Sequence, residues 1–97
     1  MGNTAAGRDA DRWERDERVL WRDAPGVTII LGPNDENPIA MRGTALALWA
    51  ALDEPRTMNE IIELLMTHYH AARELIRADI EPALNRLAKS GALRRAP

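Results

Sequence analysis

Apolar and polar positions in the first half of the chain follow the short runs that are typical of strands. Residues 19–21 and 27–31 are β-prone runs on either side of a Pro25-Gly26 turn, and this arrangement predicts a hairpin. A polar turn at residues 32–37 then precedes a third short apolar run at residues 38–41. Because its first residue is proline, which has no N–H group, the third strand should lie at the edge of the sheet.

After residue 43 the apolar positions change to a helical pattern. Strong helix formers fill most of residues 45–52, and Thr44 is the expected N-cap of this first helix. The second helix should begin at Thr57, because Thr57 and Glu60 have the spacing of a capping box, in which each side chain accepts from the other residue's backbone N–H.

A third helix should run from about Ala72 to Ser90, with apolar residues at helical spacing along its inner face. Pro82 lies inside it, and because an interior proline removes one backbone hydrogen bond, we expect a kink just before it. Residues 92–94 could close the fold as a short strand or tail. The predicted fold is α+β and winged helix-turn-helix-like, with a three-stranded antiparallel sheet followed by three helices.

The 97 residues have the size of one domain. Residues 1–17 are small, polar or charged apart from Trp13, so we expect a flexible N-terminal tail there and the folded domain at residues 18–97. Trp21 and Trp49 are expected to anchor the core, because aromatic side chains bury the most apolar surface.

Charge and composition exclude several classes of function. The formal net charge is −2, with acidic and basic residues mixed along the chain, so no broad positive field is available for nucleic acid or anionic lipid. The chain has no cysteine and no apolar run of bilayer length. We therefore expect a cytoplasmic protein without a membrane partner.

The sequence also lacks the patterns of a catalytic or metal site. No phosphate-binding loop, zinc-ligand spacing or nucleophile with a neighbouring base is evident. His68 and His70 are two residues apart, which places them on different sides of a helix. We predict that the chain is not an enzyme and needs no metal or cofactor.

Four short motifs, in their order and spacing, resemble the PqqD family over about residues 19–94. They are Gly43-Thr44-Ala45 with Trp49, Pro55-Arg56-Thr57, Arg77-Ala78-Asp79-Ile80 and Gly91-Ala92-Leu93.

This resemblance implies a binder of the leader segment of ribosomally synthesised precursor peptides. The leader would pair as an extra strand with the third strand, lie against the third helix, and be presented to a modifying enzyme such as a leader peptidase, a cyclase or a radical enzyme. The peptide-binding residues implied on these two elements are Ile39, Ala40, Met41, Arg73, Ile76, Arg77, Asp79, Ile80 and Ala83.

Each of these residues also has a structural interpretation. Strand alternation puts Ile39 and Met41 on one face and Ala40 on the other, so the first two could belong to the core. Ile76, Ile80 and Ala83 could pack in the core, and the charged residues of the third helix could form an ordinary solvated face.

Two other functions compete with leader binding. A winged-helix DNA-binding regulator would place the third helix in the major groove. That helix, however, carries four basic and three acidic residues between Arg73 and Lys89, which is too balanced for phosphate-dominated binding. The other alternative is a subunit whose free sheet edge pairs with a partner enzyme or with its own copy, as a homodimer.

Overall fold

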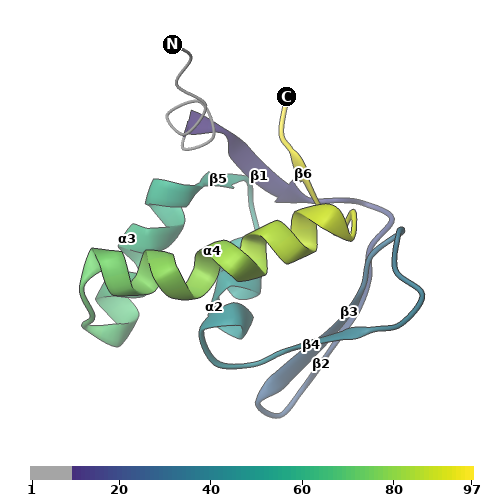
Figure 1. The fold of residues 1–97 in the computed structure, drawn as a ribbon, viewed down its shortest axis with the longest axis horizontal. Coiled ribbons are helices and arrows are strands. Elements are labelled where there is room, and N and C mark those ends of the chain that lie inside the picture. The colour runs from purple at the N-terminus through teal and green to yellow at the C-terminus, as the bar shows by residue number, and fades with distance from the viewer. Residues whose placement is uncertain (1–9) are drawn as a thin grey trace.

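Two small antiparallel sheets and three helices make up residues 10–97, the part of the chain that the computed structural model describes (Figure 1). Strands β2 (Leu20–Ala24), β3 (Val27–Leu31) and β4 (Ile39–Met41) form one sheet in the order β2-β3-β4. The helices are α2 (Gly43–Ala51), α3 (Met58–Tyr69) and α4 (Arg73–Lys89). The predicted α+β plan with a meander before three helices is confirmed.

The β2-β3-β4 sheet has the register that its hydrophobic pattern requires. Gly26 adopts a positive φ of 73° in the turn between β2 and β3, a conformation that glycine adopts without strain. Thr28 pairs with Met41, and Ile30 pairs with Ile39, so these four side chains share the inner face and are buried. The third strand begins one residue after Pro38 and lies at the edge of the sheet, as predicted.

The first two helices begin in different ways. Helix α2 starts at Gly43 after Arg42, whose side chain makes no capping bond, so the prediction of Thr44 as N-cap was wrong by two residues. Helix α3 has the predicted capping box, because the Thr57 hydroxyl accepts from the Glu60 N–H at 3.2 Å and Glu60 Oε1 accepts from the Thr57 N–H at 2.8 Å.

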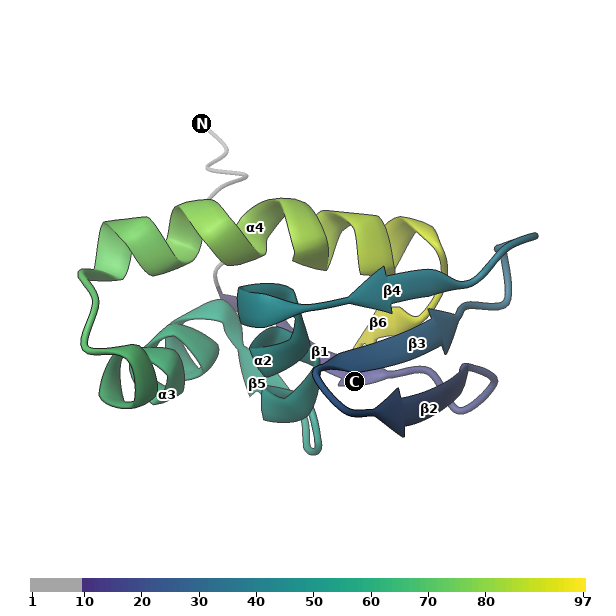
Figure 2. The same ribbon diagram turned by 90° about the horizontal axis from the view of Figure 1, so that it is seen from below.

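Helix α4 continues through Pro82 without interruption (Figure 2). Both Pro82 and Ala78, whose carbonyl loses its helical donor, are exposed to solvent. Water can therefore replace the missing donor, which explains how the sequence tolerates a proline here. Large apolar side chains from the sheet and all three helices form the core between these layers, among them Ile30, Leu48, Trp49, Leu52, Ile61, Ile62, Ile80 and Leu87.

A second sheet lies at the other side of the helices. Its central strand β1 (Arg12–Arg15) pairs with β5 (Arg56–Thr57) and with β6 (Leu93–Arg95). Beyond the strand, the Asp16 N–H donates to the Ala92 carbonyl at 2.9 Å. The short C-terminal strand was predicted, whereas β1 was not.

The flexible tail expected at residues 1–17 is therefore incorrect over its second half. Residues 12–15 form a strand, Trp13 packs against the core and the Asp16 side chain is buried. Residues 1–9 of the predicted tail lie outside the described residues. The physical reason for the error is that β1 finds its hydrogen-bond partners about 40 and 80 residues further along the chain.

The two tryptophans expected in the core have different environments. Trp49 is 1% exposed, but Trp21 stands on edge strand β2 and is 45% exposed, so its placement in the core was wrong. The rings meet edge to face with centroids 5.9 Å apart. Arg15 reaches over from β1 with its guanidinium carbon 4.7 Å from the Trp21 centroid and 4.4 Å from the Trp49 centroid. Cation–π contacts thus hold β1 against the hairpin.

None of the helices in residues 10–97 has both the length and the apolar character that a membrane span requires.

Candidate functional site

The free edge of β4 is the first component of the candidate site. Within residues 10–97, β4 pairs with β3 on one side and with no strand on the other. In an antiparallel ladder, alternate residues direct their N–H and C=O groups to opposite sides. Part of the β4 backbone is therefore left as a row of unpaired donors and acceptors, onto which another extended segment can add.

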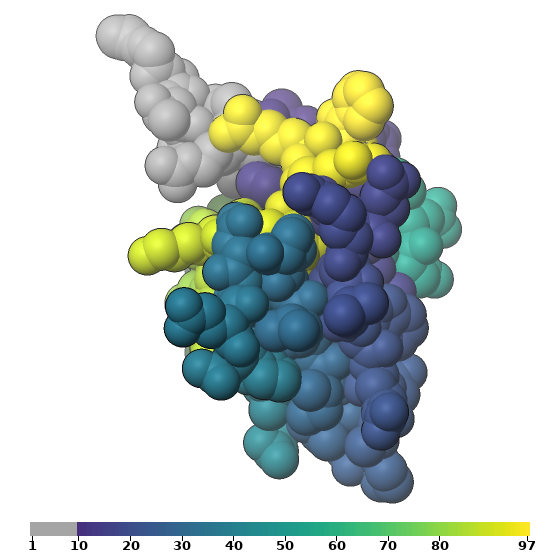
Figure 3. All heavy atoms as spheres, turned by 90° about the vertical axis from the view of Figure 1, so that its right-hand side faces the viewer, coloured from purple at the N-terminus to yellow at the C-terminus, as the bar shows by residue number. Residues whose placement is uncertain are grey.

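Helix α4 lies beside this edge and supplies a second wall. Figure 2 shows α4 above β4, with β4 running antiparallel to the C-terminal half of the helix. At the start of β4, Figure 3 shows the loop after β3 (blue) next to the C-terminal end of α4 (yellow-green). A pocket of about 500 Å³ lies between them, and it is lined by Asn34, Asp35, Glu36, Asn37, Pro38, Ile39, Arg86, Lys89 and Ser90.

The loop of this pocket is held to the end of α4 by several hydrogen bonds. The Asn34 N–H donates to the Ser90 carbonyl at 2.9 Å, and the Asn34 amide side chain donates to the Lys89 carbonyl at 3.2 Å. Asp35 accepts from the Gly32 N–H at 3.0 Å. These bonds fix the entrance of β4 relative to α4, so the pocket is formed before any ligand enters.

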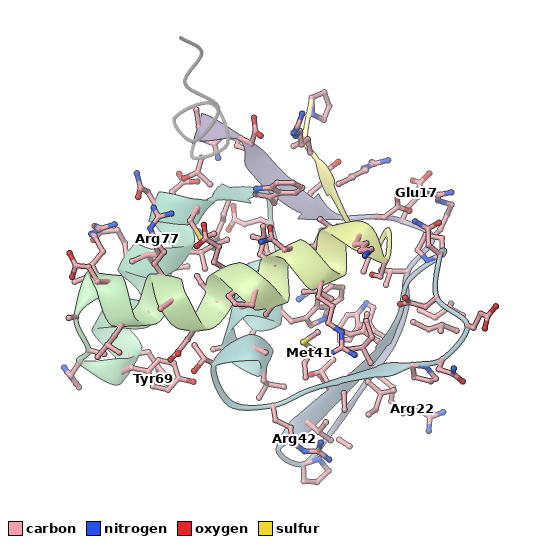
Figure 4. All side chains as sticks on the ribbon, viewed as in Figure 1. Glu17, Arg22, Met41, Arg42, Tyr69 and Arg77 are labelled. Atoms are coloured by element: carbon pink, nitrogen blue, oxygen red, sulfur yellow. The ribbon has the colours of Figure 1, made fainter. Side chains whose placement is uncertain are left out.

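The predicted site residues of β4 have two environments. Ile39 and Met41 are only 4% and 2% exposed, and Met41 points from β4 toward the interior beneath α4 (Figure 4). These two side chains therefore belong to the core, which was the alternative interpretation, and they leave little surface for a ligand. Ala40 is exposed on the other face, so β4 offers its backbone and one small side chain.

The predicted site residues of α4 point in three directions. Ile76 and Ile80 are buried in the core, Ala83 is half-buried and Asp79 is exposed. Arg73 forms an ion pair with Glu63 and donates to Asn59 at 3.2 Å, so it faces α3. Arg77 is 3.9 Å from Glu81 and lies on the side of α4 away from β4 (Figure 4). The structure thus does not bring Arg73 and Arg77 to the β4 edge.

Arg86 and Lys89 also line the groove, although neither was among the residues predicted to bind the peptide. Asp79, Ala83 and Arg86 follow one another at four- and three-residue spacing, so they share one flank of α4. Because Arg86 lines the pocket with Ile39, this is the flank that faces β4. The helical spacing was available in the sequence, but it did not indicate which of the two polar flanks would face the sheet.

The described residues contain no group of three or more His, Asp or Glu side chains placed to hold a metal ion. The strongest pKa shift of a carboxyl group within residues 10–97 lies in the connection between β1 and β2, away from the groove. There the Arg18 guanidinium donates to Asp16 at 2.9 and 3.1 Å, and these bonds lower the pKa of Asp16 to about 2.

Comparison with known proteins places this geometry in a family. Residues 28–93 match the family model of coenzyme PQQ synthesis protein D, PqqD. The chain belongs to the PqqD family. The matched segment includes β3, β4 and all three helices of the described part, and it confirms the resemblance inferred from the sequence motifs. None of the curated proteins matches the chain significantly.

Two solved structures share the PqqD-like fold. One is the solution NMR structure of the PqqD truncation of Methylobacterium extorquens PqqCD, described as a functional and stand-alone recognition element for ribosomally synthesised and post-translationally modified peptides. It has 27% identity and a TM-score of 0.71, covering 90% of this chain and 93% of that one. The other is TbiB1 in complex with the TbiA(beta) leader peptide, with 17% identity and a TM-score of 0.72, covering 84% of this chain and 94% of that one.

Proposed function

We propose that this PqqD-family protein binds the leader segment of a ribosomally synthesised precursor peptide by strand addition to β4. The observation that carries the proposal is the unpaired edge of β4 beside α4, with a preformed pocket at its start. The descriptions of the two similar structures, one a recognition element and the other a complex with a leader peptide, support it.

The length of β4 limits how much the backbone alone can contribute to binding. Depending on which groups of its three residues face outward, β4 offers two to four hydrogen bonds to an added strand. At a net value of about 1 kcal/mol each, they contribute about 2 to 4 kcal/mol, whereas micromolar affinity requires about 8. Side chains of the leader must therefore contribute the rest, and the pocket beside Pro38 and Arg86 is a site where one or two of them can be buried.

We further propose that the chain presents the bound leader to a modifying enzyme such as a leader peptidase, a cyclase or a radical enzyme. Pairing through a three-residue strand holds only a short segment of the leader. The rest of the precursor remains free to enter a second protein's active site. In this proposal the PqqD-family chain supplies binding and orientation, and its partner supplies the chemistry.

The environment of α4, which would be the recognition helix of a DNA-binding protein, does not support the DNA-binding alternative. Arg73 and Arg77, which the alternative would need to contact phosphates, pair with Glu63 and Glu81. A cation held by a carboxylate on its own protein contributes less to phosphate binding, because the existing pair must first be separated.

A titration followed by NMR tests the proposal. Peptides covering the N-terminal segments of small precursor-like proteins encoded beside this gene would be added to the ¹⁵N-labelled chain. We expect chemical-shift changes at residues 39–41 and along the Asp79 and Arg86 flank of α4, with a Kd in the micromolar range. No change at these residues with about 100 μM peptide, which is far above a micromolar Kd, would overturn it. Sedimentation analysis of the free chain separates leader binding from pairing of two copies through β4.

A further inference from the structure

Four exposed cations within residues 10–97 stand out because their side chains make no hydrogen bond or ion pair. They are Arg22, Arg42, Arg86 and Lys89. The other described cations all have partners. Most pair with carboxylates, as Arg94 does with Glu14 at 2.7 Å, and Arg15 donates to the Trp49 carbonyl. In a chain with a net charge of −2, these are the cations of residues 10–97 that remain available to a negatively charged partner.

Three of these four cations bracket the free edge of β4. Arg86 and Lys89 line the pocket at the start of the strand, together with Ile39. Arg42 directly follows Met41 at the other end of the strand, and Figure 4 shows it pointing away from α4. The fourth, Arg22, lies on β2 opposite Ile29, which in turn pairs with Ala40, so it is two strands away from the free edge.

Within the described residues, the carboxylates near the groove form no ion pair with these cations. Asp35 and Glu36 line the same pocket as Arg86 and Lys89, but within the described residues neither forms an ion pair. Asp35 accepts from the Gly32 N–H instead. Asp79 is exposed on the flank of α4 that faces β4. Within the described residues, Arg86 and Lys89 are therefore available at the start of the groove, and Arg42 at its other end.

We propose that the leader recognised by this chain is an acidic peptide, with carboxylate side chains at both ends of the segment that pairs with β4. One would lie beside Arg42, and the other beside Arg86 and Lys89. An extended strand rises about 3.3 Å per residue, so the distance from residue 38 to residue 42 is about 13 Å, or about four residues. Because Arg42 points away from α4 whereas Arg86 and Lys89 lie on α4, the two carboxylates should be on opposite faces of the added strand and therefore an odd number of residues, about five, apart. This inference rests on the proposed function and narrows its substrate class.

The expected effect is moderate because all three cations are exposed. An exposed ion pair contributes little in high dielectric and is screened by salt, so we expect the loss of one cation to weaken binding roughly two- to fivefold at low ionic strength. This loss of affinity should become smaller when the salt concentration is raised. The backbone pairing contributes without regard to charge, and the carboxylates select which peptide pairs.

Selection from a random peptide library tests the inference without knowledge of the natural leader. Random twelve-residue peptides displayed on yeast would be selected with the fluorescently labelled full chain, and the recovered sequences would be aligned. The recovered peptides would then be titrated against the wild type, Arg86→Gln with Lys89→Gln, and Arg42→Gln. Arg22→Gln is the matched control, because it removes another exposed cation that has no partner within residues 10–97 and lies two strands away from the free edge. Thermal melts followed by circular dichroism verify that all variants fold.

The outcomes separate the inference from the proposed function. Recovered peptides with Asp or Glu about five residues apart would support it, provided that Arg42→Gln and the Arg86→Gln, Lys89→Gln double variant weaken their binding and Arg22→Gln does not. Peptides that shift the β4 amides in NMR but have no acidic enrichment, or that bind the groove variants as well as the wild type, would overturn the inference while leaving strand addition intact. If no recovered peptide perturbs β4, both the proposed function and this inference fail.

Discussion

Methylation of alternate backbone amides in a bound leader should reveal how it is held. If the leader adds as a strand to β4, every second N–H in the paired segment donates to a β4 carbonyl, and the others point away from it. N-methylation removes one donor and places a methyl group between the strands. Each sensitive position should therefore lose at least the net value of one hydrogen bond, about 1 kcal/mol, and more from the steric clash.

The three-residue length of β4 sets the extent of this pattern. Sensitive positions should number one or two, two residues apart, with tolerant positions between them. Fluorescence anisotropy of singly methylated peptides would measure a loss of about fivefold or more at sensitive sites, since 1.4 kcal/mol is tenfold. Uniform tolerance would show that side chains alone hold the peptide. Sensitivity with helical spacing would show that it binds as a helix, and either result would refute strand addition.

Three further predictions concern the fold. Thr57→Ala removes the hydroxyl of the α3 capping box and should lower the free energy of unfolding by about 1 kcal/mol in chemical denaturation. Trp49→Ala should lower the free energy of unfolding by about 3 to 5 kcal/mol, and Trp21→Ala should lower it clearly less, because Trp21 is half-exposed. Equal losses for the two variants in chemical denaturation would contradict the assignment of Trp49 alone to the core. Because Arg18 lowers the pKa of Asp16 in the folded state, the ionised Asp16 side chain stabilises the fold. This contribution to the free energy of unfolding is complete above about pH 4 and is lost as the pH falls toward 2. Asp16→Asn should therefore flatten this part of a stability profile measured against pH.

The elements that could be predicted from the sequence are those specified by neighbouring residues. The Pro25-Gly26 turn defines the hairpin, and Thr57 with Glu60 defines the start of α3. Strand β1 has no such local signal. Its four residues have a mixed pattern, and their partners include Thr57 and Arg94, which are distant in sequence. A strand stabilised mainly by long-range pairing is not apparent until the rest of the fold is known.

The two polar flanks of α4 show why the candidate site was only partly predictable. Periodicity correctly identified Ile76 and Ile80 as the buried stripe, but charged residues border that stripe on both sides. Packing against α3 assigns Arg73 to an ion pair, while the turn after β3 brings Arg86 into the groove with Ile39.

The different surroundings of Arg73 and Arg86 also determine what each cation can bind. In the sequence, Arg73 and Arg86 are equivalent basic residues on one helix. In the fold, Arg73 is paired with Glu63, whereas within the described residues the Arg86 side chain has no partner beside an open strand edge. An incoming carboxylate at Arg73 would have to displace Glu63, and at Arg86 it would not. Selectivity for an acidic peptide should therefore depend on Arg86, Lys89 and Arg42, the cations around β4 that have no partner within residues 10–97.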